Sequence, residues 1–218
     1  MVPGNRVAIA LLLAAVVSSG CTTSVAGHAV RAAGGRPSGP ISAQALLLQD
    51  GDDTPLGRAS SEPVGDNYFT SVQPPACSAA LLFKGSPLRP AGASDFAESA
   101  YRFGDSSALY AESIDVYDRE LNTHEVVRSG FTKVSDCHDD AIGLSPSGLF
   151  KPMRLGSFGI PENEILTWTM TRPDWTCSYG LAAVPQIVLL IAVCDSSAGF
   201  PMDEWAAKRK AQLEGRTA

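Results

Sequence analysis

The segment from Cys177 to Cys194 restricts the possible folds of this chain more than any other. Two short apolar runs meet there at Pro185-Gln186, which is the pattern of a β-hairpin. A hairpin centred on that dipeptide places Cys177 directly opposite Cys194. With a two-residue loop the cysteines form a non-hydrogen-bonded pair, in which Cα atoms approach to ~4.5 Å, within reach of a disulfide. Because proline cannot adopt the positive φ of a primed turn, we expect a wider, four-residue loop.

The first twenty residues have the pattern of an export signal. Arg6 ends a short polar start, and residues 7–17 form an unbroken apolar run of eleven residues. A helix that spans a bilayer needs ~20 residues, so this run suits the core of a signal peptide instead. Small residues then precede Cys21, an arrangement that resembles the lipobox of bacterial lipoproteins, in which the cysteine receives the lipid. Ser18 replaces the usual Leu or Val of that motif, and the alternative is an ordinary cleaved signal.

These boundaries divide the chain into a signal peptide over 1–20, a flexible tether over 21–40 and one folded domain over 41–218. The tether is rich in small residues, Gly and Pro, as linkers are. We expect lipid, including palmitate, on Cys21 to hold the domain at the extracytoplasmic face of the cell membrane. Loss of the signal removes one Arg and no acid, so the net charge changes from −6 to −7. This acidic balance argues against nucleic acid as a partner, because phosphate binding needs clustered Lys and Arg.

The four cysteines other than Cys21 predict two disulfides, because an exported chain matures in an oxidising compartment. Four cysteines allow three disulfide connectivities. The hairpin that places Cys177 opposite Cys194 favours the one that joins these two residues. The remaining bridge, Cys77–Cys137, closes a loop of ~60 residues, which chain-entropy models value at ~4 kcal/mol. A zinc site is the alternative, but the chain has no CxxC pair and His138 directly follows Cys137, which is poor ligand spacing. We therefore expect no metal.

Strands and helices follow one another in a way that indicates an α+β fold with a mostly antiparallel sheet. Apolar and polar residues alternate over 108–117, and a turn at 104–107 joins this segment to a partner strand at 96–103. Acids at the start and bases at the end of 202–213 indicate a helix. The other expected elements are helices at 41–49 and 119–134, a helix turn or buried strand at 77–84, strands at 153–158, 165–172, 176–184 and 187–193, and a loop over 50–75.

Residues suited to catalysis are sparse. The densest group of titratable side chains is Cys137-His138-Asp139-Asp140, where the histidine could act as a general base with an acid to orient it. The alternative is that these residues form a polar loop beside a disulfide and have no catalytic role. Neither a nucleophile elbow nor a glycine-rich phosphate loop occurs, so we expect no catalytic residue and no cofactor.

Aromatic residues in the expected sheet are more suggestive of binding. Trp168, Trp175 and Tyr179 fall on its strands. Large rings there are usually core, but some can line a ligand cleft. These three are the candidates for ligand contact.

The order of these features is similar to one known family. A proline-flanked cysteine (Pro74-Pro75-Ala76-Cys77), a second cysteine at 137, the Trp175-Thr176-Cys177 hairpin closed at Cys194 and a terminal helix follow in turn. This order resembles the extracellular sensor domain of the mycobacterial serine/threonine kinase PknH, and the mycobacterial lipoproteins built on that domain, over about residues 41–214. The tryptophan that is usual before the second cysteine is absent. The resemblance implies a single domain with a twisted antiparallel sheet packed by helices, two disulfides and a cleft for an unknown ligand, without established enzymatic activity.

Three functions remain open from the sequence. The first is a non-catalytic cell-envelope lipoprotein whose sensor-like domain binds an unknown small molecule or envelope ligand in a cleft. The second is a secreted hydrolase that uses His138, which requires that residue to lie in a pocket with an acid in hydrogen-bond reach. The third is a protein-interaction module without a small-molecule site, which predicts a shallow surface with one large apolar patch.

Overall fold

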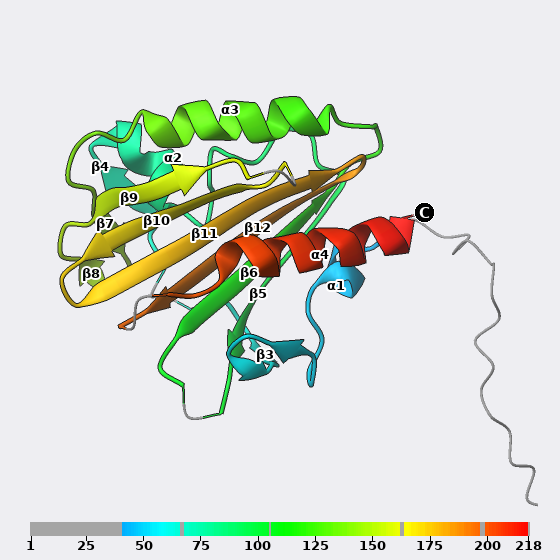
Figure 1. Ribbon diagram of the computed structural model, residues 1–218, viewed down its shortest axis with the longest axis horizontal. Coiled ribbons are helices and arrows are strands. Elements are labelled where there is room, and N and C mark those ends of the chain that lie inside the picture. The colour runs from blue at the N-terminus through cyan, green and yellow to red at the C-terminus, as the bar shows by residue number, and fades with distance from the viewer. Residues whose placement is uncertain (1–40, 66–67, 105, 162–163, 197–198, 218) are drawn as a thin grey trace, which may run out of the picture. The chain divides into compact units, whose positions relative to one another are not determined.

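A seven-stranded antiparallel sheet forms the centre of the domain, in the order β3-β5-β6-β12-β11-β10-β9 (Figure 1). The computed structural model describes residues 41–65, 68–104, 106–161, 164–196 and 199–217. The predicted signal peptide, the tether, Ser18 and Cys21 lie outside the described residues. The strands are β3 (Ser60–Glu62), β5 (Asp95–Arg102), β6 (Leu109–Val116), β9 (Arg154–Gly159), β10 (Leu166–Arg172), β11 (Trp175–Val184) and β12 (Ile187–Asp195).

The central hairpin has the register expected from the sequence. β11 pairs with β12 from Val184 opposite Ile187 outward to Cys177 opposite Cys194, and a disulfide joins those two cysteines. β5 and β6 form the second expected hairpin. Both strands of the central hairpin are buried along nearly their whole lengths, because helices cover the two faces of the sheet.

The expectation of a wide loop in this hairpin was wrong. Val184 pairs directly with Ile187, so the connection is the two residues Pro185-Gln186, and neither has a positive φ. Tertiary hydrogen bonds hold this short turn. The backbone N–H of Leu121 donates to the Pro185 carbonyl at 2.6 Å, and that of Tyr117 donates to the Gln186 carbonyl at 2.9 Å.

Helices lie on both faces of the sheet. α3 (Thr123–Ser135) and the short α2 (Ser78–Leu81), which follows the 3-10 turn η1 (Pro75–Cys77), cover one face; α1 (Ala43–Leu46) and α4 (Met202–Thr217) cover the other (Figure 1). α3 begins at Asn122, whose side chain accepts a hydrogen bond from the backbone of Glu125 at 3.1 Å, as N-cap residues do. Among the described residues, no helix combines the length and the apolar character needed to cross a membrane.

Gly130 lets α3 approach the sheet closely. A Cβ built at this position would lie 2.8 Å from Leu181 Cδ2 and 3.1 Å from Leu166 Cδ2, which is closer than packed carbon atoms sit. The glycine weakens the helix by ~1 kcal/mol relative to alanine, but it removes the atom that would hold helix and sheet apart.

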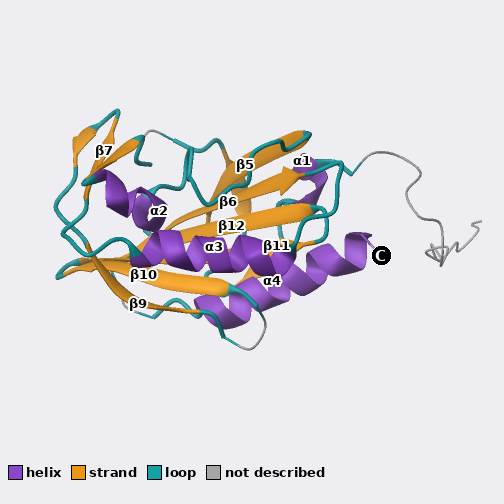
Figure 2. Cartoon of the chain, turned by 90° about the horizontal axis from the view of Figure 1, so that it is seen from above, coloured by secondary structure: helices purple, strands orange, loops and turns teal. Residues whose placement is uncertain are grey.

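Residues 50–75 are not the plain loop that we expected. They contain β1 (Asp53–Thr54), β2 (Gly57–Arg58), β3 and β4 (Ser71–Gln73). β3 extends the edge of the main sheet beside β5, and β4 joins β7 (Ile142–Ser145) and β8 (Gly148–Leu149) in a small three-stranded sheet. Strands of two or three residues are too short to show a hydrophobic period, so their distant partners define them. Figure 2 shows β7 and α2 together at one end of the main sheet.

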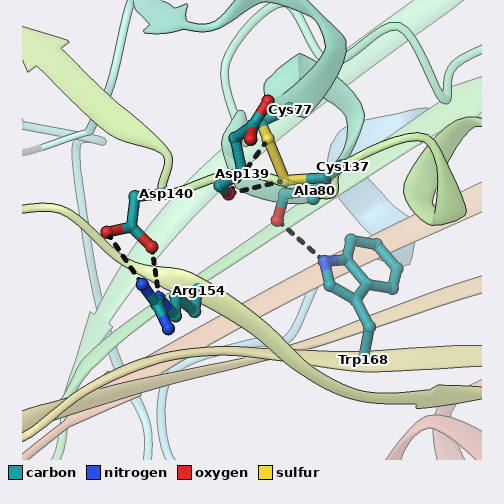
Figure 3. The surroundings of a disulfide bond; sticks show 7 residues. All are labelled: Cys77, Ala80, Cys137, Asp139, Asp140, Arg154 and Trp168. Atoms are coloured by element: carbon teal, nitrogen blue, oxygen red, sulfur yellow. Dashed lines mark hydrogen bonds and ion pairs between the residues drawn. A yellow bond between two sulfur atoms is a disulfide. The ribbon is translucent and has the colours of Figure 1, made fainter.

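The second disulfide ties this end of the domain to α3. Cys77 lies in η1 and Cys137 lies just after α3, and the two are joined as the sequence suggested (Figure 3). The carbonyl oxygen of Asp139 lies 3.7 Å from the sulfur of Cys77 and 3.8 Å from that of Cys137. The fold is therefore the expected α+β single domain, with a mostly antiparallel sheet packed by helices and two disulfides.

Candidate functional site

An aromatic-lined cavity of about 240 Å³, here called the aromatic hollow, lies on the α3 face of the sheet. Its floor is the sheet itself. Side chains from four adjacent strands form that floor: Leu109 from β6, Ala192 and Cys194 from β12, Trp175, Cys177 and Tyr179 from β11, and Arg172 from β10.

The walls come from segments outside the main sheet. They are contributed by the stretch that leads to β4, the stretch around α2, and the chain after β8: Tyr68, Phe69, Leu81, Phe83, Phe150 and Met153. The rings contact one another across these segments. The Tyr68 and Phe83 ring centroids are 5.3 Å apart, and Phe69 meets Phe150 edge to face at 4.9 Å. Such pairs stabilise by ~0.5–1.5 kcal/mol beyond the burial of their area.

Two sheet residues fasten α2 to the floor. The Tyr179 hydroxyl donates to the Leu81 carbonyl at 3.2 Å. The Trp168 indole N–H donates to the Ala80 carbonyl at 2.8 Å (Figure 3). The two rings stack with their centroids 5.0 Å apart. The two hydrogen bonds fix the position of α2 relative to strands β10 and β11.

Each disulfide supports one part of the hollow. Cys177–Cys194 lies in the floor, and both of its cysteines line the hollow. Cys77–Cys137 anchors the segment that carries the α2 wall to the end of α3. Both cross-links therefore join segments that border the hollow.

The lining carries one charged group, Arg172, among the residues that define the hollow. Burial, and then the charges of Glu62 and Glu98, raise the pKa of the Tyr68 phenol. Burial raises the pKa of Tyr179 as well. Both phenols are therefore neutral at physiological pH, and the hollow is an apolar site with a single cation at its border.

The three aromatic candidates from the sequence occupy different places. Trp175 and Tyr179 line the hollow. Trp168 stands behind Tyr179 and is only 2% exposed, so it supports the site from the core. Trp168 is instead among the residues that border a second, more open groove of about 550 Å³ beside the start of α4. The hydrophobic pattern could select strand aromatics, but it could not say which ring faces a cavity.

Several lining residues were missed by the sequence reasoning. Tyr68, Phe69 and Phe150 lie in stretches without a strand or helix period, and Arg172 ends a strand like any surface arginine. The number of aromatic residues near Cys77 could have indicated a binding site, since Tyr68, Phe69 and Phe83 all lie within ten residues of it. Their meeting with β11 depends on the tertiary structure.

The His138 side chain is exposed, and it lines neither the aromatic hollow nor the groove beside the start of α4. Asp140 pairs with Arg154 instead (Figure 3). The described residues also contain no group of three or more His, Cys, Asp and Glu side chains placed to hold a metal ion.

A buried ion pair on the opposite face is the other feature that the sequence concealed. Glu112 of β6 and Arg209 of α4 are fully or almost fully buried and form a bidentate pair, in which Nε and Nη2 of Arg209 donate to the two carboxylate oxygens. The Tyr110 hydroxyl donates to Glu112 at 3.1 Å and receives the Trp205 indole N–H at 2.8 Å. Arg209 also donates to the Leu46 carbonyl at 2.9 Å. This network joins α4 and α1 to the sheet.

Comparison with known proteins assigns the chain to a family. Proteins named "Putative lipoprotein LprH" from Mycobacterium tuberculosis and Mycobacterium bovis are each 52% identical to it over 211 residues, covering 94% of this chain and 92% of the relative. The chain belongs to this family of mycobacterial lipoproteins. No protein-family model matches the sequence.

The fold has a solved counterpart. The crystal structure of the extracellular domain of PknH from Mycobacterium tuberculosis superposes with a TM-score of 0.61, covering 79% of this chain and 95% of that domain at 15% identity. At that identity the likeness concerns the fold alone. It confirms the resemblance drawn from the cysteine order and the closing hairpin.

Proposed function

We propose that the chain is a lipid-anchored protein of the cell envelope whose extracytoplasmic domain binds a small apolar molecule in the aromatic hollow and catalyses no reaction. The family relationship to lipoproteins and the fold of an extracellular domain support the location. The observation that carries the binding role is the hollow itself: about 240 Å³, lined by aromatic and aliphatic side chains, as small-molecule sites usually are. The exposure of His138 removes the geometric support for a hydrolase.

Ligand binding is tested with a neutral apolar probe and a variant that fills the hollow. Titration of the purified protein with 1-octanol, followed by ligand-observed NMR, should show saturable binding. Ala192→Leu adds bulk inside the hollow and should abolish it. Ala93→Leu, on an exposed loop, is the matched control and should bind as the original protein does. Absence of saturable binding, or equal binding by all three proteins, would remove this proposal.

The anchor is tested separately. Radiolabelled palmitate should be incorporated into the protein made in a mycobacterial host, and Cys21→Ser should prevent incorporation and release the protein from membranes. Export of an unlabelled original chain would instead support an ordinary cleaved signal at the Ser18–Cys21 region.

A further inference from the structure

The charged rim of the aromatic hollow points to the class of its ligand. Arg172 ends β10 directly opposite Trp175 of β11 in the sheet register. Both residues line the hollow. The guanidinium carbon of Arg172 lies 5.9 Å from the centroid of the Trp175 ring, close enough for a cation–π interaction that orients the group. The Arg172 side chain is 16% exposed, so it is largely removed from water and yet reachable from the hollow.

A neighbouring carboxylate occupies only part of this guanidinium. Arg172 Nε donates to Asp174 at 3.0 Å, and the described residues provide no further hydrogen-bond acceptor for the two terminal nitrogens. Asp174 is shared with Lys151 at 3.4 Å. Desolvation opposes its ionisation, but the hydrogen bond from Lys151 and the charges of Lys151 and Arg172 hold the pKa of Asp174 below its ordinary value. The charge of Asp174 is thus divided between Lys151 and Arg172, so it neutralises the Arg172 guanidinium only in part.

The carboxylates of Glu62 and Glu98 also act on the hollow, since after burial they contribute to raising the pKa of Tyr68. Each is paired with a cation, Glu62 with Arg102 and Glu98 with Lys84 at 3.6 Å, so Arg172 is the charged group that an anion meets in the lining. A terminal N–H pair of arginine matches the two oxygens of a carboxylate or phosphate better than a point charge does.

We propose that the ligand of the aromatic hollow is a small amphipathic anion, with an apolar chain or ring among the aromatic side chains and a carboxylate or phosphate on Arg172. This inference rests on the proposed function and specifies the ligand. The size follows from the volume. A liquid water molecule takes ~30 Å³, so a hollow of about 240 Å³ accommodates on the order of eight non-hydrogen atoms. Larger ligands would project past Arg172 into solvent.

The test compares an acid with the alcohol of the same chain length. Octanoate and 1-octanol share their apolar chain and differ in the charged group. In the full purified protein at low salt, octanoate should bind at least tenfold more tightly than 1-octanol in calorimetric or NMR titrations, because a charge-assisted hydrogen bond in a partly buried site contributes that much. Octyl phosphate should share the preference if the site recognises both head groups.

Two arginine variants make the assignment specific. Arg172→Met keeps an unbranched apolar side chain and removes the charge; it should abolish the preference for octanoate, so that this variant binds octanoate and 1-octanol equally. Arg154→Met, on the adjacent strand β9 with its side chain 78% exposed, should preserve the tenfold preference.

The outcomes separate this inference from the proposed function. Equal binding of octanoate and 1-octanol, or an undiminished preference in Arg172→Met, overturns the anionic ligand and leaves an apolar site intact. Binding of neither probe overturns both. A preference that disappears equally in Arg154→Met shows a general charge effect and also overturns the role of Arg172.

Discussion

The two faces of the central sheet differ in how completely they are filled. On the α4 face, a sixteen-residue helix lies on the strands, and the buried Glu112–Arg209 pair with Tyr110 and Trp205 fills the interface. On the α3 face, α3 covers only part of the sheet. The four-residue α2 and the small sheet cover the rest and leave the aromatic hollow.

This difference shows how one sheet can provide both stability and a binding site. Alternate residues of the same strands face opposite sides, so β11 contributes Ala182 to the filled core and Tyr179 to the hollow. A long helix can pack continuously, whereas short segments held by a disulfide can stand away from the sheet. We infer that stability depends chiefly on the α4 face and that binding depends on the α3 face.

The largest expected effect is the loss of Arg209. Arg209→Leu leaves the Glu112 carboxylate buried without its partner, which should lower the free energy of unfolding by ~3–5 kcal/mol in urea titrations monitored by circular dichroism. The combined variant Glu112→Leu with Arg209→Leu should recover most of this loss, because no buried charge then remains unpaired. A double variant as unstable as the single one would show that packing, and not charge, holds α4.

Removal of either disulfide should lower the free energy of unfolding somewhat less than the loss of Arg209 does, and the two bridges should differ in their effect. Replacing Cys77 and Cys137 by alanine opens a loop with a sequence separation of 60, and replacing Cys177 and Cys194 opens one of 17. Chain-entropy models give losses of ~4 and ~3 kcal/mol respectively. Urea unfolding of the two double variants checks the order. The reverse order would mean that the hairpin bridge contributes more than its loop length implies.

A methyl group added beneath α4 should destabilise the filled face. The Cβ in Gly180→Ala would lie 2.9 Å from Met202 Sδ and 3.1 Å from Ala206 Cβ, so we expect a loss of ~1–3 kcal/mol from overpacking. Gly159→Ala, on edge strand β9, meets no atom within 4 Å and should be neutral or stabilising by ~0.4–1 kcal/mol. Thermal unfolding of both variants provides the comparison. Equal melting temperatures would contradict the close packing of α4.

The smallest effect concerns the wall of the hollow. Tyr179→Phe removes the hydroxyl that donates to the Leu81 carbonyl and should cost ~0.5–1.5 kcal/mol. Tyr68→Phe serves as the control, because within the described residues its hydroxyl has no hydrogen-bond partner. Amide hydrogen exchange in α2 should quicken in the first variant only. Unchanged exchange in Tyr179→Phe would mean that Trp168 alone fastens this helix.

Much of the fold was predictable because its signals are local. The two apolar runs around Pro185-Gln186 specified the central hairpin, and a symmetric count placed Cys177 opposite Cys194, as the structure has them. The strands at 96–103 and 108–117 and the last helix followed from period and charge placement. The prediction of a four-residue loop at Pro185 failed because hydrogen bonds from Tyr117 and Leu121 stabilise the two-residue turn. Local rules of turn formation do not include such bonds.

The sequence by itself determined the α+β class of the chain, the two disulfides and the strand that bears Trp175 and Tyr179. Periodicity, turn chemistry and cysteine spacing act over a few residues, so they can be read directly. Only the tertiary structure decided that Trp168 lies behind the site, that Arg172 borders it, and that Glu112 meets Arg209. These contacts join segments that are up to about a hundred residues apart, and packing, not local preference, brings them together.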